Sequence, residues 1–558
     1  MDNVAIADQL ELLSKLLDIH GEDPDKARHF AAAAFSIEKL PYPLTATPRE
    51  KWRQIRGIGS GTTELIAELI ENGRLSRLEE LISKTPEGVI AMLSVKGIGP
   101  KKIHTIWKEM GIESIGELLY ACQENRLTLF KGFGEKTLQA VAESIQFMMQ
   151  HQGHFLYAEA EAIFPPIELY LQKLFGEEQV MVTGHYRRQS NTLNELAFVV
   201  TRSVQDIKPK FITAQPPELL EETEDSLLYL LKNGLRLRIH ASPENGHQRL
   251  LETSCSEEFL DAFNLLPDNT AITTGKTLTE QALFEKKGLP YIIPCRREKA
   301  SVLFNAEENS STPLIQASDI KGLIHCHSNW SDGMNSLEEM AQACLQKNWE
   351  YMVISDHSVS AFYAKGLNAE RVAAQHQLID QLNRQLAPFK IFKSIESDIL
   401  NDGSLDYPNE VLSSFDLVIA SVHSNLRMSQ EKANARLLKA IQNPFTAILG
   451  HMTGRLLLSR EGYPVNHQLI IDACASNGVS IELNAHPRRL DIDWYWIDKA
   501  LEKGVLISIN PDAHNLEGMN DVRYGVLAAQ KAGLIAERNL SSFSLSQFEA
   551  WLSKRKTS

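Results

Sequence analysis

The chain has 558 residues, about twice the ~250–300 at which a single hydrophobic core stops growing, so a one-domain protein is excluded. Hydrophobic residues make up 43% of the chain and charged residues 23%, an ordinary globular composition that excludes wholesale disorder. The formal net charge of -14 excludes a generally basic surface, so any contact with DNA must be local.

The sequence gives no sign of export or of a membrane segment. No run approaches the ~20 apolar residues of a membrane helix, and the start MDNVAIADQLELL is acidic and amphipathic, unlike a signal peptide. The 6 cysteines are scattered without C-x-x-C spacing, which argues against a disulfide framework and a cysteine zinc site. We expect a soluble, cytoplasmic protein that does not bind membranes.

The N-terminal quarter is predicted to be helical, and a short pattern recurs three times within it. Apolar residues at helical spacing predict helices over 3–19 and 27–40. The pattern is a basic residue, then Gly-apolar-Gly, then an amphipathic helix, in IRGIGSGTTELIAELI, VKGIGPKKIHTIW and FKGFGEKTLQAVAESI. The glycines allow a tight hairpin, and the free N–H groups at the start of the next helix suit a phosphate oxygen.

These three hairpins are candidate contacts to a DNA backbone. A single Gly-x-Gly turn can equally be a plain connection between helices. Three with the same helix behind them, two followed by lysines, favour DNA binding. The candidate residues are Gly57, Gly59, Gly97, Gly99, Lys101, Lys102, Gly132, Gly134 and Lys136.

The rest of the chain changes character twice. Residues 159–298 have mixed α and β periodicity, with strands predicted over 181–184, 196–200 and 235–241. A polar stretch without periodicity follows and predicts a linker.

The last part alternates seven β-rich runs with amphipathic helices, which predicts parallel strands with right-handed crossovers. Every strand ends in polar residues, which favours a closed barrel over an open sheet. The seven strands are predicted over 323–328, 351–357, 391–397, 417–424, 446–453, 479–486 and 505–514.

Histidines and carboxylates recur at the ends of these strands. The set is His325, His327, Asp332, His357, Glu396, His423, His451, Asp512 and His514. Any one of them could be structural, but packing gives no reason for titratable residues to recur at successive strand ends. They exceed the three or four ligands that one ion takes from protein, so two or three ions sharing carboxylates fit better. Mixed imidazole and carboxylate ligation suits zinc, manganese or iron(II).

Such a site predicts phosphoester hydrolysis. Adjacent divalent ions activate water at neutral pH and stabilise the attacking and leaving oxygens of an in-line displacement. We expect no catalytic group beyond the ligands and the water that the ions hold. Arg455 and Arg489 follow the fifth and sixth strands and are candidates for holding the phosphate, although each can equally be a surface arginine.

These residues carry a family resemblance. HCHSNWSDG, SDHS, IESDI, SVHSN, GHMTGR and PDAH resemble, in order and spacing, the motifs of the PHP (polymerase and histidinol phosphatase) domain. The resemblance implies a distorted seven-stranded (β/α) barrel with three divalent ions, Mn²⁺ or Zn²⁺, with Fe²⁺ as a further candidate. It assigns His325, His327, Glu396 and Asp512 to one ion, Glu396, His423 and His451 to a second, and Asp332, His357 and His514, with Asp512 as a further candidate, to the third.

The order of the parts resembles that of a bacterial family X DNA polymerase with a C-terminal PHP domain, over essentially the whole chain. The resemblance implies a multidomain fold with an all-α helix–hairpin–helix region, an α+β nucleotidyltransferase-like palm and thumb, and a distorted (β/α)7 barrel. It places a helical lyase-type domain with the first hairpin at 1–82, a fingers-like hairpin region at 83–155, the palm and thumb at 156–300, a linker at 301–318 and the PHP domain at 319–558. In that family the PHP domain is a manganese-dependent 3′–5′ exonuclease.

The palm departs from the family at the residues of polymerase chemistry. VTGHYRRQSNTLNELAFVV is similar to the family's Gly-Ser-x-Arg-Arg … Asp-x-Asp signature and keeps Gly184, Arg187 and Arg188. His185 stands at the nucleotide-binding serine, and Glu195 and Ala197 stand at the two catalytic aspartates. The third acid aligns with Arg236 in LRLRIHA. Because paired magnesium ions need carboxylates, we predict that the palm has lost its polymerase metal site and serves as a scaffold.

The leading hypothesis is a metal-dependent DNA 3′–5′ exonuclease or repair phosphodiesterase. Its partner would be gapped, nicked or 3′-recessed duplex DNA, bound without sequence preference. One alternative is a still-active gap-filling polymerase that also has the exonuclease. Another is a small-molecule phosphatase of the histidinol phosphate type, against which the three hairpins argue. A non-enzymatic DNA-binding scaffold would be favoured only if metal ligands were missing.

Overall fold

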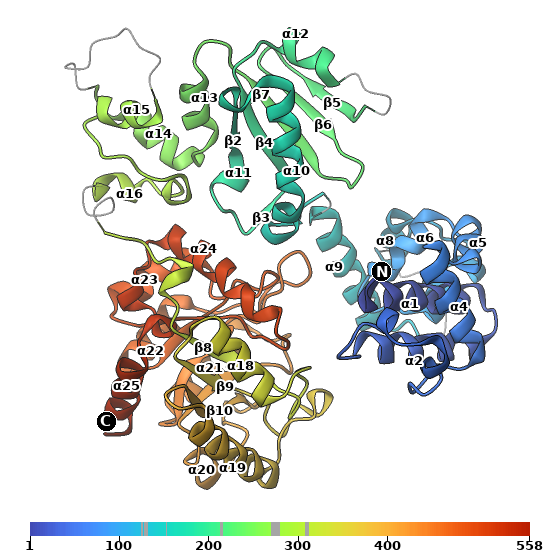
Figure 1. Ribbon diagram of the computed structural model, residues 1–558. Coiled ribbons are helices and arrows are strands. Elements are labelled where there is room, and N and C mark those ends of the chain that lie inside the picture. Colours follow the sequence, from blue (N-terminus) through green and yellow to red (C-terminus); the bar gives the residue numbers. More distant parts are fainter. Residues whose placement is uncertain are drawn as a thin grey trace. The chain divides into compact units, whose positions relative to one another are not determined.

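The computed structural model describes residues 1–123, 127, 132–151, 153–211, 216–268, 279–306 and 312–557 (Figure 1). The chain divides into two compact units, residues 1–152 and 153–558. Among the described residues, no helix has both the length and the apolar character needed to cross a bilayer.

The first unit is helical, as predicted. Its helices are α1 (Asn3–His20), α2 (Pro24–Glu38), α3 (Arg49–Trp52), α4 (Ser60–Asn72), α5 (Ser76–Lys84), α6 (Glu87–Ala91), α7 (Pro100–His104), α8 (Ile115–Gln123) and α9 (Glu135–His151). The Asp2 side chain accepts from the backbone N–H of Ala5 and begins α1, and Gly21 ends this helix in the left-handed conformation. Leu10 and Leu13 of α1 are fully buried in the core of this unit.

The three Gly-x-Gly hairpins have one backbone geometry. The first glycine of each, Gly57, Gly97 or Gly132, has a φ of 89°, 94° or 95°, which side chains rarely tolerate. A side chain at the second glycine of each hairpin would meet open space within 4 Å. Gly59 and Gly99 directly precede α4 and α7, so the space beside the start of each of these helices is open.

The second unit begins with a five-stranded sheet in the order β2-β4-β7-β6-β5, with α10 packed against it (Figure 1). Its strands are β2 (Val180–Thr183), β4 (Glu195–Val200), β5 (Glu218–Glu222), β6 (Ser226–Leu230) and β7 (Arg236–Ala241), and β1 (Phe155–Leu156) pairs separately with β3 (Thr192–Leu193). The helices are α10 (Tyr157–Phe175), α11 (Gly184–Arg187), α12 (Val204–Ile207), α13 (Gly246–Thr253), α14 (Glu257–Leu265), α15 (Glu280–Lys286) and α16 (Ser301–Phe304). The three predicted strands are present, and β5 and β6 are additional.

The C-terminal part is a seven-stranded, all-parallel sheet in the order β14-β13-β12-β11-β10-β9-β8. Its strands are β8 (Gly322–Cys326), β9 (Tyr351–Ile354), β10 (Lys390–Asp398), β11 (Leu417–Ser421), β12 (Thr446–Leu449), β13 (Ser480–Asn484) and β14 (Ile507–Asn510). A parallel bridge between Cys326 and Ala513 joins the ends of β8 and β14. The predicted barrel is therefore nearly closed.

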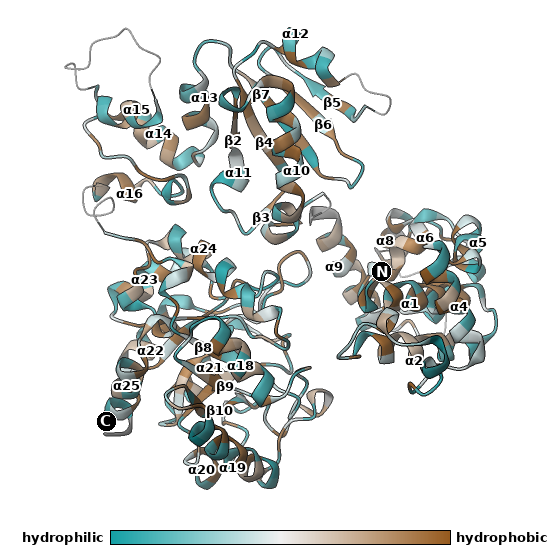
Figure 2. Ribbon diagram, viewed as in Figure 1, coloured by the Kyte–Doolittle hydropathy of each residue, from teal (hydrophilic) through white to brown (hydrophobic). Residues whose placement is uncertain are grey.

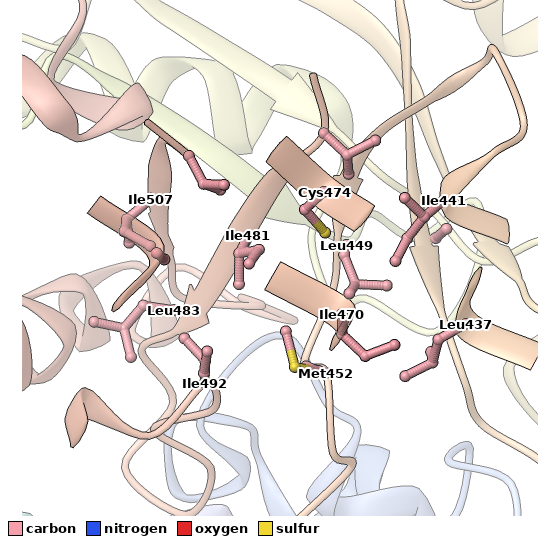
Figure 3. Packing of buried hydrophobic residues seen from close by; sticks show 14 of the residues in the cluster. Leu437, Ile441, Leu449, Met452, Ile470, Cys474, Ile481, Leu483, Ile492 and Ile507 are labelled. Carbon is pink, nitrogen blue, oxygen red and sulfur yellow. The ribbon is translucent and has the colours of Figure 1, made fainter. Parts of the chain in front are cut away.

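Helices alternate with the barrel strands and complete its core. They are α18 (Leu337–Gln346), α19 (Ala369–Leu386), α20 (Asn409–Leu412), α21 (Gln430–Ile441), α22 (His467–Asn477), α23 (Ile497–Glu502), α24 (Val522–Ala532) and α25 (Leu545–Thr557). Ile481 of β13 packs among Leu449, Ile470 and Cys474 (Figure 3). Figure 2 shows α19 as mostly hydrophilic, as expected of a helix on the outside of a barrel.

The segment placed at 301–318 as a linker has structure at both ends. Val302 and Leu303 of α16 are buried in one cluster with Phe259 and Phe284 of the preceding part. Ile315 is fully buried in the barrel core, and its N–H donates to the carbonyl of Leu534 at 3.0 Å. Residues 307–311 lie outside the described residues.

Candidate metal centre

All nine predicted ligands meet at the carboxyl ends of the barrel strands. His325 lies in β8 and Glu396 in β10, and the other seven follow the strands directly or in the next turns. Parallel strands bring their carboxyl ends to one face of a barrel, which explains why residues so far apart in sequence converge.

His325 and His327 reach the site through an irregular strand. The pairing of β8 with β9 shifts register between Ile324 and Cys326, and His325 has a φ of 61°. Their rings lie 5.4 Å apart. Asp512 also has a left-handed φ, of 55°. Such conformations are strained for residues other than glycine and are characteristic of functional sites.

Glu396 is the hub of the cluster. Its Oε1 lies 2.9 Å from His451 Nε2, 3.1 Å from His423 Nε2 and 3.2 Å from His325 Nε2, and its Oε2 lies 3.1 Å from His357 Nδ1 and 3.7 Å from His327 Nε2. The side chain is 1% exposed. One carboxylate with imidazoles around both oxygens is suited to bridging two ions.

Two further carboxylates complete the cluster. Asp512 Oδ1 lies 3.0 Å from His327 Nε2 and 3.6 Å from His325 Nε2. Asp332 Oδ2 lies 3.4 Å from His514 Nε2 and 3.7 Å from His357 Nε2. Asp512 therefore lies beside His325 and His327, and Asp332 lies beside His357 and His514.

The donor atoms fit divalent ions. Three overlapping groups have ligand atoms within 4.8 Å of one another: His327, Asp332, His357 and His514; His325, His327 and Asp512; and His357, Glu396 and His423. Two donors that each lie about 2.1 Å from one ion are themselves about 3.0–3.4 Å apart, which matches most of these contacts. Within the described part of the chain, His325 Nε2, His327 Nδ1, His451 Nδ1 and Glu396 Oε2 are buried and make no hydrogen bond. Buried polar atoms rarely remain so without a function, and an ion beside Glu396 would satisfy His325 Nε2 and Glu396 Oε2, whereas His451 turns Nε2 rather than Nδ1 toward Glu396.

The cluster is deep at one side and open at the other. The side chain of His325 is fully buried, whereas those of Asp332 and His514 are 29% and 38% exposed. A pocket of 410 Å³ lined by Asp512, His514 and Asp521 opens beside them. The cluster is therefore accessible from solvent on the Asp332 and His514 side.

Burial and neighbouring charges together set the pKa values of the cluster. Burial alone would raise the pKa of Glu396, but the nearby His423 and His325 hold it well below its usual range. Burial lowers the pKa of His423, but Glu396 and Asp398 together raise it to about 10. Burial and the neighbouring His514 lower the pKa of His327 to about 3. An ionised Glu396 and a neutral His327 are the forms that bind metal, whereas His423 must lose its proton to bind one.

Three buried carboxylates behind the ligands were not predicted from the sequence as part of the site. Asp398 Oδ1 accepts from His423 Nδ1, and Glu482 Oε2 lies 2.6 Å from His325 Nδ1. Asp356, which precedes His357, accepts from the backbone N–H of Ser328, which follows His327, at 2.8 Å. The available signal was spacing, because Asp398 lies two residues after Glu396 on one strand and Asp356 directly precedes His357.

The two candidate phosphate arginines have different surroundings. Arg489 Nε lies 3.6 Å from Asp512 Oδ2, at the edge of the cluster. The Arg455 guanidinium is engaged elsewhere, with Asp493 at 2.5 Å and the backbone carbonyl of Arg489 at 2.9 Å. Only Arg489 approaches the ligands.

Comparison with known proteins agrees with this architecture. Residues 1–75 match a helix-hairpin-helix domain, residues 89–146 a SAM-like helix-hairpin-helix tandem and residues 324–486 the PHP domain. The chain is 31% identical over 98% of its length, and over 98% of the relative's length, to the "DNA polymerase/3'-5' exonuclease PolX" of Bacillus subtilis. The chain belongs to the PolX family. These are family X DNA polymerases with a C-terminal PHP domain.

Relatives that match a shorter stretch of the chain are named differently. A probable phosphatase of Caldanaerobacter subterraneus is 30% identical over 22% of this chain and 51% of its own length. A probable phosphatase of Caldicellulosiruptor saccharolyticus is 25% identical over 34% of this chain and 78% of its own length.

The palm positions of this PolX chain lie together without a carboxylate cluster. Glu195 and Ala197 of β4 pair in parallel register with Arg236 and Arg238 of β7. Arg238 Nε lies 3.0 Å from Glu195 Oε2, so an arginine already neutralises this carboxylate. Among the described residues, every close group of three or more candidate ligands belongs to the barrel.

Proposed function

We propose that this chain is a metal-dependent DNA 3′–5′ exonuclease whose active site is the barrel cluster and whose palm no longer polymerises. The observation that carries the proposal is the convergence of nine imidazole and carboxylate side chains, Glu396 among them, at one barrel face. The name of the Bacillus relative, which includes both activities, supports the exonuclease.

The chemistry follows from the donor set. Divalent ions in such a site, which we propose to be two or three Mn²⁺ or Zn²⁺, supply a nucleophile at neutral pH and neutralise phosphate charge. We propose His325, His327, Glu396 and Asp512 for one ion, Glu396, His423 and His451 for the second, and Asp332, His357 and His514 for the third. Arg489 lies where its guanidinium can hold the scissile phosphate.

We propose that the first unit holds duplex DNA without reading its sequence. The open surface at the second glycine of each hairpin lets a phosphate approach the backbone closely. Lys101 and Lys136 are exposed behind two of the hairpins, whereas Lys102 Nζ donates to the carbonyl of Gly97 at 3.1 Å. Gapped, nicked or 3′-recessed duplexes would suit this mode of binding. We propose that the chain acts on such DNA in the cytoplasm.

Replacing both Lys101 and Lys136 with glutamate should weaken duplex binding. Each lost phosphate contact lowers the salt dependence of binding by about one unit of slope, and the loss should be similar for every sequence. Fluorescence anisotropy with a labelled 3′-recessed duplex measures both quantities. The matched control reverses Lys15, which pairs with Glu11 on the surface of α1. Unchanged affinity in the double variant, or equal loss of activity on a small chromogenic phosphodiester, would contradict this role for the hairpins.

The palm arginines support the loss of polymerase activity. Both Arg187 and Arg188 align with the nucleotide-binding signature, but each is held by a carboxylate of the chain. Arg187 makes a two-pronged pair with Glu280 at 2.6 and 2.9 Å, and Arg188 Nε lies 3.3 Å from Glu298. A nucleoside triphosphate would have to displace Glu280, which is buried, and Glu298, which is 15% exposed.

We propose that the palm now acts as a support for the barrel. Lys531 of α24 donates to Glu298 at 2.7 Å and to the carbonyl of Arg188 at 2.6 Å, and its side chain is 1% exposed. A signature residue of the palm therefore takes part in a buried joint with the PHP barrel.

Replacing Lys531 with methionine should destabilise this joint. Removing one partner of a buried pair costs about 3 kcal/mol or more, because the other charge stays buried. We expect the thermal midpoint to fall by roughly 5 °C or more. Lys503→Met, which breaks an exposed pair with Asp472, is the control and should shift it little. Equal midpoints for the two variants would show that the joint contributes nothing.

A comparison of substrates tests the proposed function. With Mn²⁺, the chain should shorten a 5′-labelled 3′-recessed duplex from its 3′ end far more efficiently than it hydrolyses histidinol phosphate. The phosphatase-named relatives make a small-molecule phosphatase the second candidate. Efficient hydrolysis of the small phosphate with no shortening of DNA would establish that candidate instead.

A further inference from the structure

Glu482 of β13 is a buried carboxylate behind the metal centre that is not among the nine proposed ligands. Its side chain is fully buried. Its Oε2 lies 2.6 Å from His325 Nδ1 and accepts from Asn510 Nδ2 at 2.7 Å. Its Oε1 accepts from the backbone N–H of His451 at 3.1 Å and from Asn484 Nδ2 at 3.0 Å. Four contacts on two oxygens leave this carboxylate no freedom to move.

These contacts determine which nitrogen of His325 faces the cluster. The backbone N–H of His451 and the amide of Asn484 can only donate, and the Asn484 orientation is set because its Oδ1 accepts from the backbone N–H of His486 at 3.1 Å. Both Glu482 oxygens therefore serve as acceptors, so His325 Nδ1 is the donor in their 2.6 Å contact. The lone pair of His325 then lies on Nε2, which is 3.2 Å from Glu396 and 3.6 Å from Asp512.

Glu482 also reaches the surroundings of two other ligands. The backbone of His451, after β12, is tied to it directly. Asn484 Nδ2 makes a second bond, of 3.1 Å, to Asp512 Oδ2, after β14. One side chain on β13 is thus connected to ligands from three other strands of the barrel. None of its hydrogen bonds goes to Asp332, His357 or His514.

We propose that Glu482 is the positioning residue of the two inner metal sites, which are those that use His325 and His451. The outer site is the one built from Asp332, His357 and His514. Glu482 holds His325 as an Nε2 ligand, fixes the backbone of His451 and orients Asp512 through Asn484. The inference rests on the proposed metal centre and adds that its inner and outer sites depend on different supporting residues. Such supports are worth about 10–100-fold in metal affinity.

Glu482→Gln tests this selectivity, because it removes the charge and changes the shape little. The probe is Mn²⁺ alone, titrated into the metal-free full-length chain and followed by the electron paramagnetic resonance of free Mn²⁺. We expect the sites that use His325 and His451 to weaken by about 10–100-fold. The site built from Asp332, His357 and His514 should keep its wild-type affinity. Wild-type affinity at all sites, or equal weakening of all of them, would overturn the proposal.

Two controls separate positioning from general damage. Asp491→Asn changes another fully buried carboxylate of the barrel, which accepts from the backbone and hydroxyl of Thr453, and should leave Mn²⁺ binding unchanged. In a chain that already carries His325→Gln, adding Glu482→Gln should cost much less than it does alone. Additive losses would show that the two residues act separately.

A measurement on the wild-type chain needs no Glu482 variant to fold. In the zinc-loaded protein, long-range ¹H–¹⁵N correlation should show His325, assigned by its absence from His325→Gln, with a proton on Nδ1. A proton on Nε2 would overturn the proposal. Manganese binding without any degradation of DNA would refute the proposed function and leave this inference standing.

Discussion

Replacing Glu396 with glutamine abolishes the manganese-dependent shortening of DNA while the barrel remains folded. The variant loses the charge that both oxygens of Glu396 present to the surrounding imidazoles. A loss of at least about 4 kcal/mol of transition-state stabilisation corresponds to about a thousandfold in rate. Single-turnover degradation of a 5′-labelled 3′-recessed duplex measures it, and His327→Ala should behave in the same way.

The control for this result keeps the barrel and changes a remote acid. Asp472→Asn on α22 alters an exposed pair with Lys503 and a part-buried hydrogen bond from Gln468, and should degrade DNA at the wild-type rate. Circular dichroism should show the same fold for all variants. A wild-type exonuclease rate in either Glu396→Gln or His327→Ala would mean that the active site lies elsewhere.

The second large effect is the absence of DNA synthesis. With His327→Ala preventing degradation, the chain should extend no primer at a one-nucleotide gap, in Mg²⁺ or in Mn²⁺. Paired magnesium ions need shared carboxylates, and Glu195 stands beside Ala197 and is already paired with Arg238. Each lost metal contact costs several kcal/mol, so residual synthesis should fall below detection.

Two outcomes bear on this account of the palm. Ala197→Asp alone should not restore synthesis, because Arg236 still stands beside Glu195 in the sheet. Template-dependent addition by the His327→Ala chain, abolished by Glu195→Ala, would contradict the account. It would place the metals on other acids, such as Glu221, which lies 3.5 Å from Arg238.

The barrel and its cluster could be predicted because they depend on local patterns. Strand runs that each end in a histidine or a carboxylate imply both the parallel order and the shared face. The local pattern does not predict the backbone conformation at His325 and His327. Their two-residue spacing predicts one face of a regular strand, whereas the structure brings them together across a register shift with a left-handed His325.

The supporting residues could not be predicted because their partners are distant in sequence. Glu482 reads as one polar residue in a buried strand, and only the fold places it against His325 and Asn510. The exposed, acidic β5 lacks the alternation that identifies a strand, since all five of its residues face solvent. Arg238 likewise resembles any strand arginine until the register of β4 and β7 places it beside Glu195.

A time course with deoxynucleotides present distinguishes degradation of DNA from its synthesis. The wild-type chain is mixed with a 5′-labelled 3′-recessed duplex, Mn²⁺ and all four deoxynucleotides, and the length of the labelled strand is followed. We predict that the strand only shortens, at a rate that the deoxynucleotides do not change, and that a chelator stops the reaction. Template-directed lengthening of the strand would contradict the account.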